Sequence, residues 1–303
     1  MAEAAPGGSA PDPHRLPSHQ VAGLYRRDVG AMRVATIHDG MLATAFDDIV
    51  DADPARCEAM HRAAHRPMPP TLSCNAFVVE TAGRLMLVDA GCGTTAPAAG
   101  HHGAGLAALG VAPDAVDAVL MTHLHRDHAA GLVDAAGRAL FRNAELVVHA
   151  DDLAFWQDGR SVARLRDSQK VDHAIAATVL AAYGDRLRPV RAGEVAPGIT
   201  AVPTPGHTPG HTAWLLQSDG ERLLIWGDVV HLPAIQFAEP RASVAYDLDS
   251  AAAAATRARV LDMVATERIP VAGVHLDFPC FGHVDARSDG GYAYVPGVWT
   301  SDL

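Results

Sequence analysis

The sequence has little positive charge, few aromatic residues and no long apolar run. Lys170 is its only lysine, and the net charge of the 303 residues is −11. An acidic chain without a basic segment is poorly suited to phosphate backbones, so we expect no nucleic-acid partner. No apolar run approaches the roughly 18 residues of a membrane-spanning helix, so we expect no membrane association. Hydrophobic residues still make up 49% of the chain, enough for a large core.

Signals for export and for disulfide formation are also missing. Residues 1–20 are rich in Ala, Pro, Gly and Ser and lack the basic start and apolar stretch of a secretory signal. We therefore expect a cytoplasmic protein in which residues 1–30 form a flexible N-terminal tail and lead-in. Residues 31–303 show no internal linker and predict a single domain. The four cysteines are scattered and form no C-x-x-C pair, which favours reduced, buried thiols.

Short apolar runs alternate with helical patterns along the chain. The runs predict strands at 32–37, 76–81, 85–89, 116–122, 145–149, 199–202, 213–217, 223–226 and 270–274. Helical patterns fall at 104–110, 128–135, 151–157, 170–183 and 249–267. Asp39-Gly40 predicts a turn, Ala82-Gly83-Arg84 a hairpin, and Ser250 a helix N-cap. The alternation predicts an α/β fold with a mixed sheet.

The densest group of polar side chains follows the predicted strand at 116–122. The segment 122–128 reads Thr-His-Leu-His-Arg-Asp-His. In extended backbone, residues two apart point the same way, so His123 and His125 can face one metal ion. Asp127 and His128 lie where the chain turns into a helix, which aims them at a neighbouring ion. Imidazole and carboxylate are ligands typical of Zn²⁺ and related divalent metals.

Three further polar residues follow apolar strands in the same way. His207, Asp228 and His275 each come at or near the first polar position after such a run. Strands of one sheet can deliver these side chains to a common edge, where open α/β sheets place their sites.

Seven ligands are enough for two ions. We predict that His123, His125 and His207 hold one ion, that Asp127, His128 and His275 hold the other, and that Asp228 bridges them. Each ion would keep an open position, as catalytic sites do. Two such ions can share a hydroxide nucleophile, whose proton Asp127 could steer. The sequence contains no G-x-S-x-G motif, which would indicate a serine nucleophile instead.

The pattern H-x-H-x-D-H followed by His, Asp and His resembles the metallo-β-lactamase superfamily of dinuclear hydrolases. The resemblance covers residues 31–303 and implies a four-layer αβ/βα sandwich with mixed β-sheets. It implies that Asp89, in the segment 87–91, supports the site without binding metal. It also implies two divalent ions, most often Zn, with Mn, Fe or Co compatible, and a homodimer.

Several segments narrow the resemblance to the methyl parathion hydrolase-like branch. They are residues 227–231 with 234–237, residues 275–279, and residues 282–283 with 290–292. The implied activity is hydrolysis of small esters, namely lactones, aryl esters or phosphotriesters. Trp156, beside Phe155, matches an aromatic residue of the leaving-group pocket in these relatives, which makes both candidate substrate-binding residues. Packing in the core is an equally open reading.

Two histidines near the ligands have other predicted roles. His231 stands where related acyl-homoserine lactonases have a tyrosine, so it could face the substrate and protonate the leaving group, or simply lie at the surface. His211, four residues after His207, is expected to orient a ligand.

Other activities of the same fold remain alternatives. A β-lactamase or acyl-homoserine lactonase would use the same nucleophile, and a glyoxalase II-type thioesterase would need a helical substrate domain that the sequence lacks. A flavodiiron-type oxidoreductase would have glutamate at position 125. A non-catalytic metal-binding module would predict lost ligands, whereas all seven are present.

Overall fold

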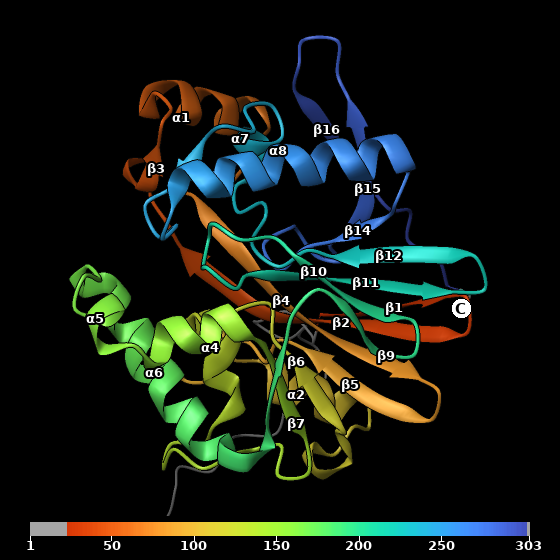
Figure 1. Ribbon diagram of the computed structural model, residues 1–303. Helices are drawn as coiled ribbons and strands as arrows, with labels where there is room; N and C mark the ends of the chain where they lie inside the picture. The colour runs from red at the N-terminus through yellow and green to blue at the C-terminus, as the bar shows by residue number, and fades with distance from the viewer. Residues whose placement is uncertain (1–22, 302–303) are drawn as a thin grey trace, which may run out of the picture.

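The computed structural model describes residues 23–301, which form two seven-stranded mixed sheets packed face to face between helices (Figure 1). The first sheet has the strand order β1-β2-β4-β5-β6-β7-β8. Its strands are β1 (Leu24–Val29), β2 (Met32–Ala43), β4 (Thr71–Thr81), β5 (Arg84–Val88), β6 (Ala118–Leu120), β7 (Glu145–His149) and β8 (Leu187–Val190). Strands β5 to β8 run parallel to one another.

The second sheet has the order β16-β15-β14-β12-β11-β10-β9. Its strands are β9 (Gly193–Ala196), β10 (Ile199–Pro203), β11 (Thr212–Ser218), β12 (Glu221–Ile225), β14 (Val271–Ala272), β15 (Phe281–Ala286) and β16 (Tyr292–Pro296). Only β12 and β14 pair in parallel within this sheet. A small separate ribbon joins β3 (Ile49–Val50) to β13 (Ser243–Val244).

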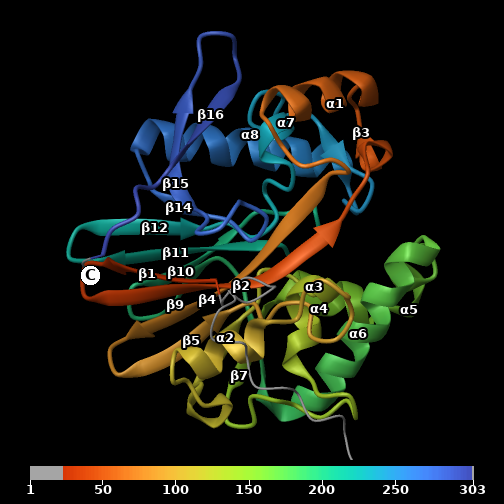
Figure 2. The same ribbon diagram turned by 180° about the vertical axis from the view of Figure 1, so that it is seen from behind.

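Helices cover the outer face of each sheet, which confirms the predicted αβ/βα sandwich. The helices are α1 (Pro54–Ala63), α2 (His102–Ala108), α3 (Arg126–Ala129), α4 (Ala150–Gln157), α5 (Gly159–Val162), α6 (Asp167–Tyr183), α7 (Pro233–Gln236) and α8 (Ser250–Glu267). In Figure 2, α8 lies over β14 and β15, whereas α2, α4 and α6 lie on the side of β5 to β7. None of the helices within residues 23–301 is both long and apolar enough to cross a bilayer.

The alternation of side chains along the strands explains the layered core. Met86 and Val88 of β5 point into the cluster between the two sheets, where Trp214 and Leu224 meet them. Leu87 points the opposite way, into the cluster beneath the helices. A strand that is apolar on both faces must be covered on both faces, so the first sheet requires the second sheet on one side and helices on the other.

Several predicted boundaries were wrong. Residues 1–22 of the predicted tail lie outside the described residues, but Leu24–Val29 of the lead-in form β1, which pairs with β2 along its whole length. The domain therefore begins before residue 31. Asp39-Gly40 is not a turn, because β2 continues through a bulge there to Ala43.

Two helix ends also differ from the prediction. The helix expected at 128–135 is a short α3 that ends at Ala129 and continues as a 3₁₀ turn over Ala130–Leu132. Asp249, and not Ser250, caps α8, because its carboxylate accepts the backbone N–H of Ala252 at 2.9 Å.

Candidate metal centre

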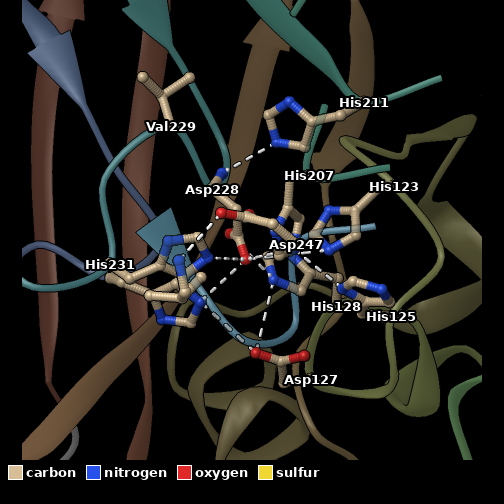
Figure 3. A network of polar contacts seen from close by, with 12 residues as sticks. His123, His125, Asp127, His128, His207, His211, Asp228, Val229, His231 and Asp247 are labelled. Atoms are coloured by element: carbon tan, nitrogen blue, oxygen red, sulfur yellow. Dashed lines mark hydrogen bonds and ion pairs between the residues drawn. The ribbon is translucent and has the colours of Figure 1, made fainter. Parts of the chain in front are cut away.

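The seven predicted ligands converge at one edge of the two sheets (Figure 3). His123 and His125 lie in the segment between β6 and α3, and Asp127 and His128 lie in α3 itself. The other three ligands come from the second sheet: His207 from the turn after β10, Asp228 from the segment after β12, and His275 from the segment after β14. The parallel ends of β5 and β6 in one sheet, and of β12 and β14 in the other, bring these segments to the same edge.

The ligands fall into two groups with the predicted membership. One nitrogen each of His123, His125 and His207 lie within 4.8 Å of one another. The second group consists of Asp127, His128, Asp228 and His275, whose donor atoms satisfy the same limit. All are buried except Asp127, whose side chain is 19% exposed.

Asp228 connects the two groups. Its Oδ2 lies 3.2 Å from Nε2 of His207 in the first group and 3.2 Å from Nε2 of His275 in the second. Its Oδ1 lies 3.1 Å from Nε2 of His128. Oδ2 of Asp228 thus reaches both groups and Oδ1 reaches the second, so this carboxylate lies between them.

A glycine allows Asp228 to come this close. Gly227 has φ of +57°, and a side chain there would place a Cβ 2.7 Å from Nε2 of His211 and 2.8 Å from Cβ of Thr122. His211 behaves as predicted, because its Nε2 accepts the backbone N–H of Asp228 at 3.0 Å. Its Nδ1 faces the carbonyl oxygen of Thr204 at 3.0 Å, which fixes the ring.

Three ligand imidazoles donate one ring N–H to a protein oxygen and turn the other nitrogen inward. Nδ1 of His128 lies 2.8 Å from Oδ2 of Asp89. Nδ1 of His207 lies 2.8 Å from Oδ1 of Asp247, and Nδ1 of His275 lies 2.7 Å from the carbonyl oxygen of Ser73. Such outer contacts fix the tautomer and the ring orientation of a metal-binding histidine.

Asp89 therefore supports the site as the sequence predicts. It also accepts the backbone N–H of Thr122 at 2.8 Å and its hydroxyl at 2.7 Å. Because that hydroxyl proton is given to Asp89, the hydroxyl oxygen can accept Nδ1–H of His123, 3.1 Å away. One carboxylate thus orients ligands in both groups, directly for His128 and through Thr122 for His123.

The donor set fits divalent metal ions. Nε2 of His123, Nε2 of His128 and Oδ1 of Asp228 are buried and have no hydrogen-bond partner. Buried polar atoms without partners are costly, and here they point toward one another. A set of imidazole nitrogens and carboxylate oxygens is suited to Zn²⁺ and related ions.

The pKa shifts favour ligand binding by His123 and His125, whereas burial of His207 is outweighed by the carboxylates of Asp228 and Asp247, which raise its pKa to about 9. Burial, with the neighbouring imidazoles, holds the pKa values of His123 and His125 well below the ordinary value. Burial also opposes protonation of His128, but the carboxylates of Asp228, Asp127 and Asp89 outweigh it and raise that pKa. The pKa of Asp228 lies well below its usual range because the surrounding histidines outweigh the effect of burial.

A cavity of about 470 Å³ opens directly above the two groups. Its floor is formed by the ligands His125, Asp127, His207, Asp228 and His275. Small molecules that enter this cavity can therefore reach the ligand atoms.

His231 does not face this cavity, contrary to the prediction that it contacts substrate. It is fully buried and is absent from the residues that line the cavity in the described part of the chain. Its Nε2 contacts Oδ2 of Asp228 at 3.1 Å, and its backbone N–H donates to Oε1 of Gln236. Burial lowers its pKa to about 4. His231 thus supports the shared carboxylate from behind, which also rules out the surface position.

The aromatic pair also lies away from the cavity. Trp156 is 1% exposed, its ring lies 5.7 Å from that of His125, and its Nε1 donates to Asp152 at 3.3 Å. Phe155 packs against Trp156 with ring centroids 5.0 Å apart. The predicted contact with substrate is replaced by core packing, because α4 turns this face toward the β-sheet and away from the opening.

Two carboxylates of the site were not predicted from the sequence. Asp247 holds His207, and it follows β13 at a loop position that carries no motif. Asp152 is fully buried in α4 and accepts the backbone N–H groups of Leu124 and Gly210 at 3.2 and 2.9 Å. It thereby ties the His123–His125 segment to the His207 turn. An aspartate in the first turn of a predicted helix is explained by the favourable interaction of a carboxylate with the helix N-terminus, so its position indicated no further role.

Comparisons with known proteins agree with this arrangement. The family model of the metallo-beta-lactamase superfamily matches residues 69–268. The crystal structure of the hydrolase AbOPH of the beta lactamase superfamily has a TM-score of 0.88 and 28% identity, and covers 93% of this chain and 100% of that one. A comparison with curated protein sequences found no match.

Two further solved structures share the fold. AidC, a dizinc quorum-quenching lactonase in complex with a product, has a TM-score of 0.87 and 21% identity over 92% of this chain and 99% of that one. A probable metal-dependent hydrolase from Staphylococcus aureus has a TM-score of 0.70 and 23% identity over 90% of this chain and 100% of that one.

Proposed function

Since the chain belongs to the metallo-beta-lactamase superfamily and is a metal-dependent hydrolase, we propose that it hydrolyses small esters at a dinuclear centre. The substrate class comprises lactones, aryl esters and phosphotriesters, as in the methyl parathion hydrolase-like branch. The observation that carries the proposal is the position of Asp228 between two groups of buried ligand atoms at the floor of one open cavity.

The predicted ligands divide between the two ions of such a centre. His123, His125 and His207 would hold one ion, Asp127, His128 and His275 the other, and Asp228 both. Two divalent ions supply a nucleophile at neutral pH and polarise the scissile oxygen. Zn is the ion that the donor set favours, and Mn, Fe and Co are compatible with it.

Asp127 differs from the other ligands in being partly exposed, with a side chain that is 19% accessible. Its Oδ2 lies 3.5 Å from Nε2 of both His128 and His275, and it lines the cavity floor. A carboxylate in this place can orient the attacking water and accept its proton while it binds metal. His231 acts through Asp228, as a positioning residue.

A lactone is a specific candidate within this class. The fold of a dizinc lactonase covers 92% of this chain with a TM-score of 0.87. The homodimer that the family resemblance implies is part of the same proposal, and a solution mass measurement tests it.

The test is a substrate panel on protein reconstituted with Zn²⁺. We expect turnover of a γ-lactone, 4-nitrophenyl acetate or a dimethyl aryl phosphotriester, and loss of that turnover in Asp228→Ala. A cephalosporin tests the β-lactamase alternative. Turnover of the cephalosporin alone, or equal turnover by the metal-free protein, would contradict the proposal.

A further inference from the structure

The cavity above the ligand groups has two chemically different walls. One wall is apolar and includes Leu42, Leu72 and Pro97. The opposite wall comes from the starts of α3 and α6, and it carries two guanidinium groups, those of Arg126 and Arg166. Figure 2 shows the end of β2 and the start of α6 on the same side of the molecule, and residues from both places line this one cavity.

Arg126 stands next to the reacting centre. It lies between the ligands His125 and Asp127 in sequence, and its side chain is 43% exposed along the cavity. Oδ1 of Asp172 accepts its backbone N–H at 3.2 Å and lies 3.5 Å from its Nη1. Asp172 thus anchors the residue to α6, and Arg126 lines the cavity beside this carboxylate.

Arg166 supplies a second positive charge farther up the same wall. It is the N-cap residue of α6, and its backbone N–H donates to Oε1 of Gln169 at 3.1 Å. Its side chain is exposed and lines the cavity. Within residues 23–301, no aspartate or glutamate forms an ion pair with it. A guanidinium in this state can bind an incoming anion without first giving up an internal partner.

The placement of these charges is unusual for this chain. The protein carries a net charge of −11, so its surface as a whole repels anions. The other charged residues of the cavity lining are Asp48, Asp127, Asp172 and Asp228, so the two arginines form its positive side. Positive groups along a concave wall attract anions to that wall. The planar fork of arginine matches the two oxygens of a carboxylate better than a lysine would.

We propose that the cavity selects esters and lactones that carry a carboxylate, with Arg126 and Arg166 as the residues that recognise it. The inference rests on the proposed ester hydrolase function and narrows its substrate class. The carboxylate binds at the arginine wall, the apolar part of the substrate packs on the Leu42–Leu72 wall, and the ester group lies on the floor between them.

Two matched pairs of substrates test this selection. The first pair is 4-acetoxybenzoate and its neutral isostere 4-acetoxybenzamide, which differ on the alcohol side of the ester. The second is the monophenyl ester of terephthalic acid and phenyl 4-carbamoylbenzoate, which differ on the acyl side. The measured quantity is the ratio of kcat/KM for the charged member to that for the neutral member, with zinc-loaded protein.

We expect a ratio of about ten or more in at least one pair, the usual effect of a hydrogen bond to a charged group. In Arg166→Gln, and more strongly in Arg126→Gln/Arg166→Gln, the ratio falls about tenfold through KM. Added NaCl lowers the wild-type ratio, because salt screens charges at an open cavity. Arg164→Gln is the matched control: this arginine is exposed two residues away and does not line the cavity, so the ratio stays unchanged.

The possible failures are distinguishable. Hydrolysis of both pairs with ratios near one, or ratios that both arginine variants leave unchanged, would overturn the selection and leave the ester hydrolase function standing. No hydrolysis of the four esters by protein that turns over the γ-lactone, 4-nitrophenyl acetate or the phosphotriester would also overturn the selection. No hydrolysis of any of these substrates would contradict the proposed function itself. Zinc content is measured for each variant, so that a loss of metal in the Arg126 variant is not mistaken for lost recognition, and Arg166→Gln alone decides in that case.

Discussion

The two halves of the metal centre are built differently. The half from the first sheet packs four ligands into six residues, His123 to His128, and a single carboxylate, Asp89, orients two of them, His128 directly and His123 through Thr122. The half from the second sheet takes His207, Asp228 and His275 from three separate segments, and a different group orients each one. Two carboxylates, Asp89 and Asp152, thus hold the compact motif, whereas each dispersed ligand has a support of its own.

The largest expected effect comes from removing Asp228, which contacts both groups of ligand atoms. Asp228→Ala deletes contacts to both groups and leaves the surrounding histidines without their central anion. We expect turnover to fall by more than the about 10²–10³-fold that loss of one oxyanion-hole donor costs. Initial rates with 4-nitrophenyl acetate at saturating Zn²⁺ measure this. A variant that retained a tenth of wild-type turnover would show that the halves work independently.

The next largest effects are expected for the carboxylates that hold ligand histidines in place. Their substitution directly tests the difference between the two halves. Asp247→Asn should weaken metal binding about 10–100-fold, mainly at the group that contains His207. Asp89→Asn should affect both groups, since it contacts His128 directly and His123 through Thr122. Stepwise Zn²⁺ titration of the metal-free variants measures the two affinities. Identical titrations of the two variants would remove the proposed difference between the halves.

Asp152 links the halves through the backbone, so its loss should act on stability. Asp152→Ala leaves the N–H groups of Leu124 and Gly210 and the Nε1–H of Trp156 without their acceptor. We expect a loss of about 2 kcal/mol in the free energy of unfolding, within the range for hydrogen bonds to a charged group. Urea unfolding of the metal-free protein measures it. An unchanged midpoint would mean that the two segments are held by other contacts.

The smallest effect is expected for His231. Because this ring touches Asp228 and not the cavity, His231→Gln should reduce turnover of an alkyl lactone and of a nitrophenyl ester by the same modest factor. A general acid would behave differently, since its loss would slow only the poor leaving group, by about 10²-fold or more. Such a selective loss would restore His231 to the role of proton donor.

The sequence predicted well which side chains meet at this site, because the segments that carry them follow apolar strands that end at a common edge. The positions of His123, His207 and His275 depend only on strand ends and residue type, both of which are local properties. The supports depend on contacts between distant segments, such as that of Asp247 with His207 across 40 residues. Local patterns carry no information about such pairs.

The same limit explains the wrong predictions about the cavity. Whether Trp156 of α4 or Arg126 of α3 lines the cavity depends on how these helices pack against the first sheet, which the periodicity of the sequence does not determine. β1 was missed because Leu24–Val29 reads Leu-Tyr-Arg-Arg-Asp-Val, with three charged residues in six. It is an edge strand, where such polarity is common and its pairing with β2 supplies the order.

The most direct test of the dinuclear centre is its metal stoichiometry. Elemental analysis of protein purified without chelator, and of the metal-free protein reconstituted with Zn²⁺, should give two ions per chain, and Asp228→Ala should lose at least one of them. One tightly bound ion per chain, unchanged in Asp228→Ala, would contradict a centre in which this carboxylate joins two groups of ligands.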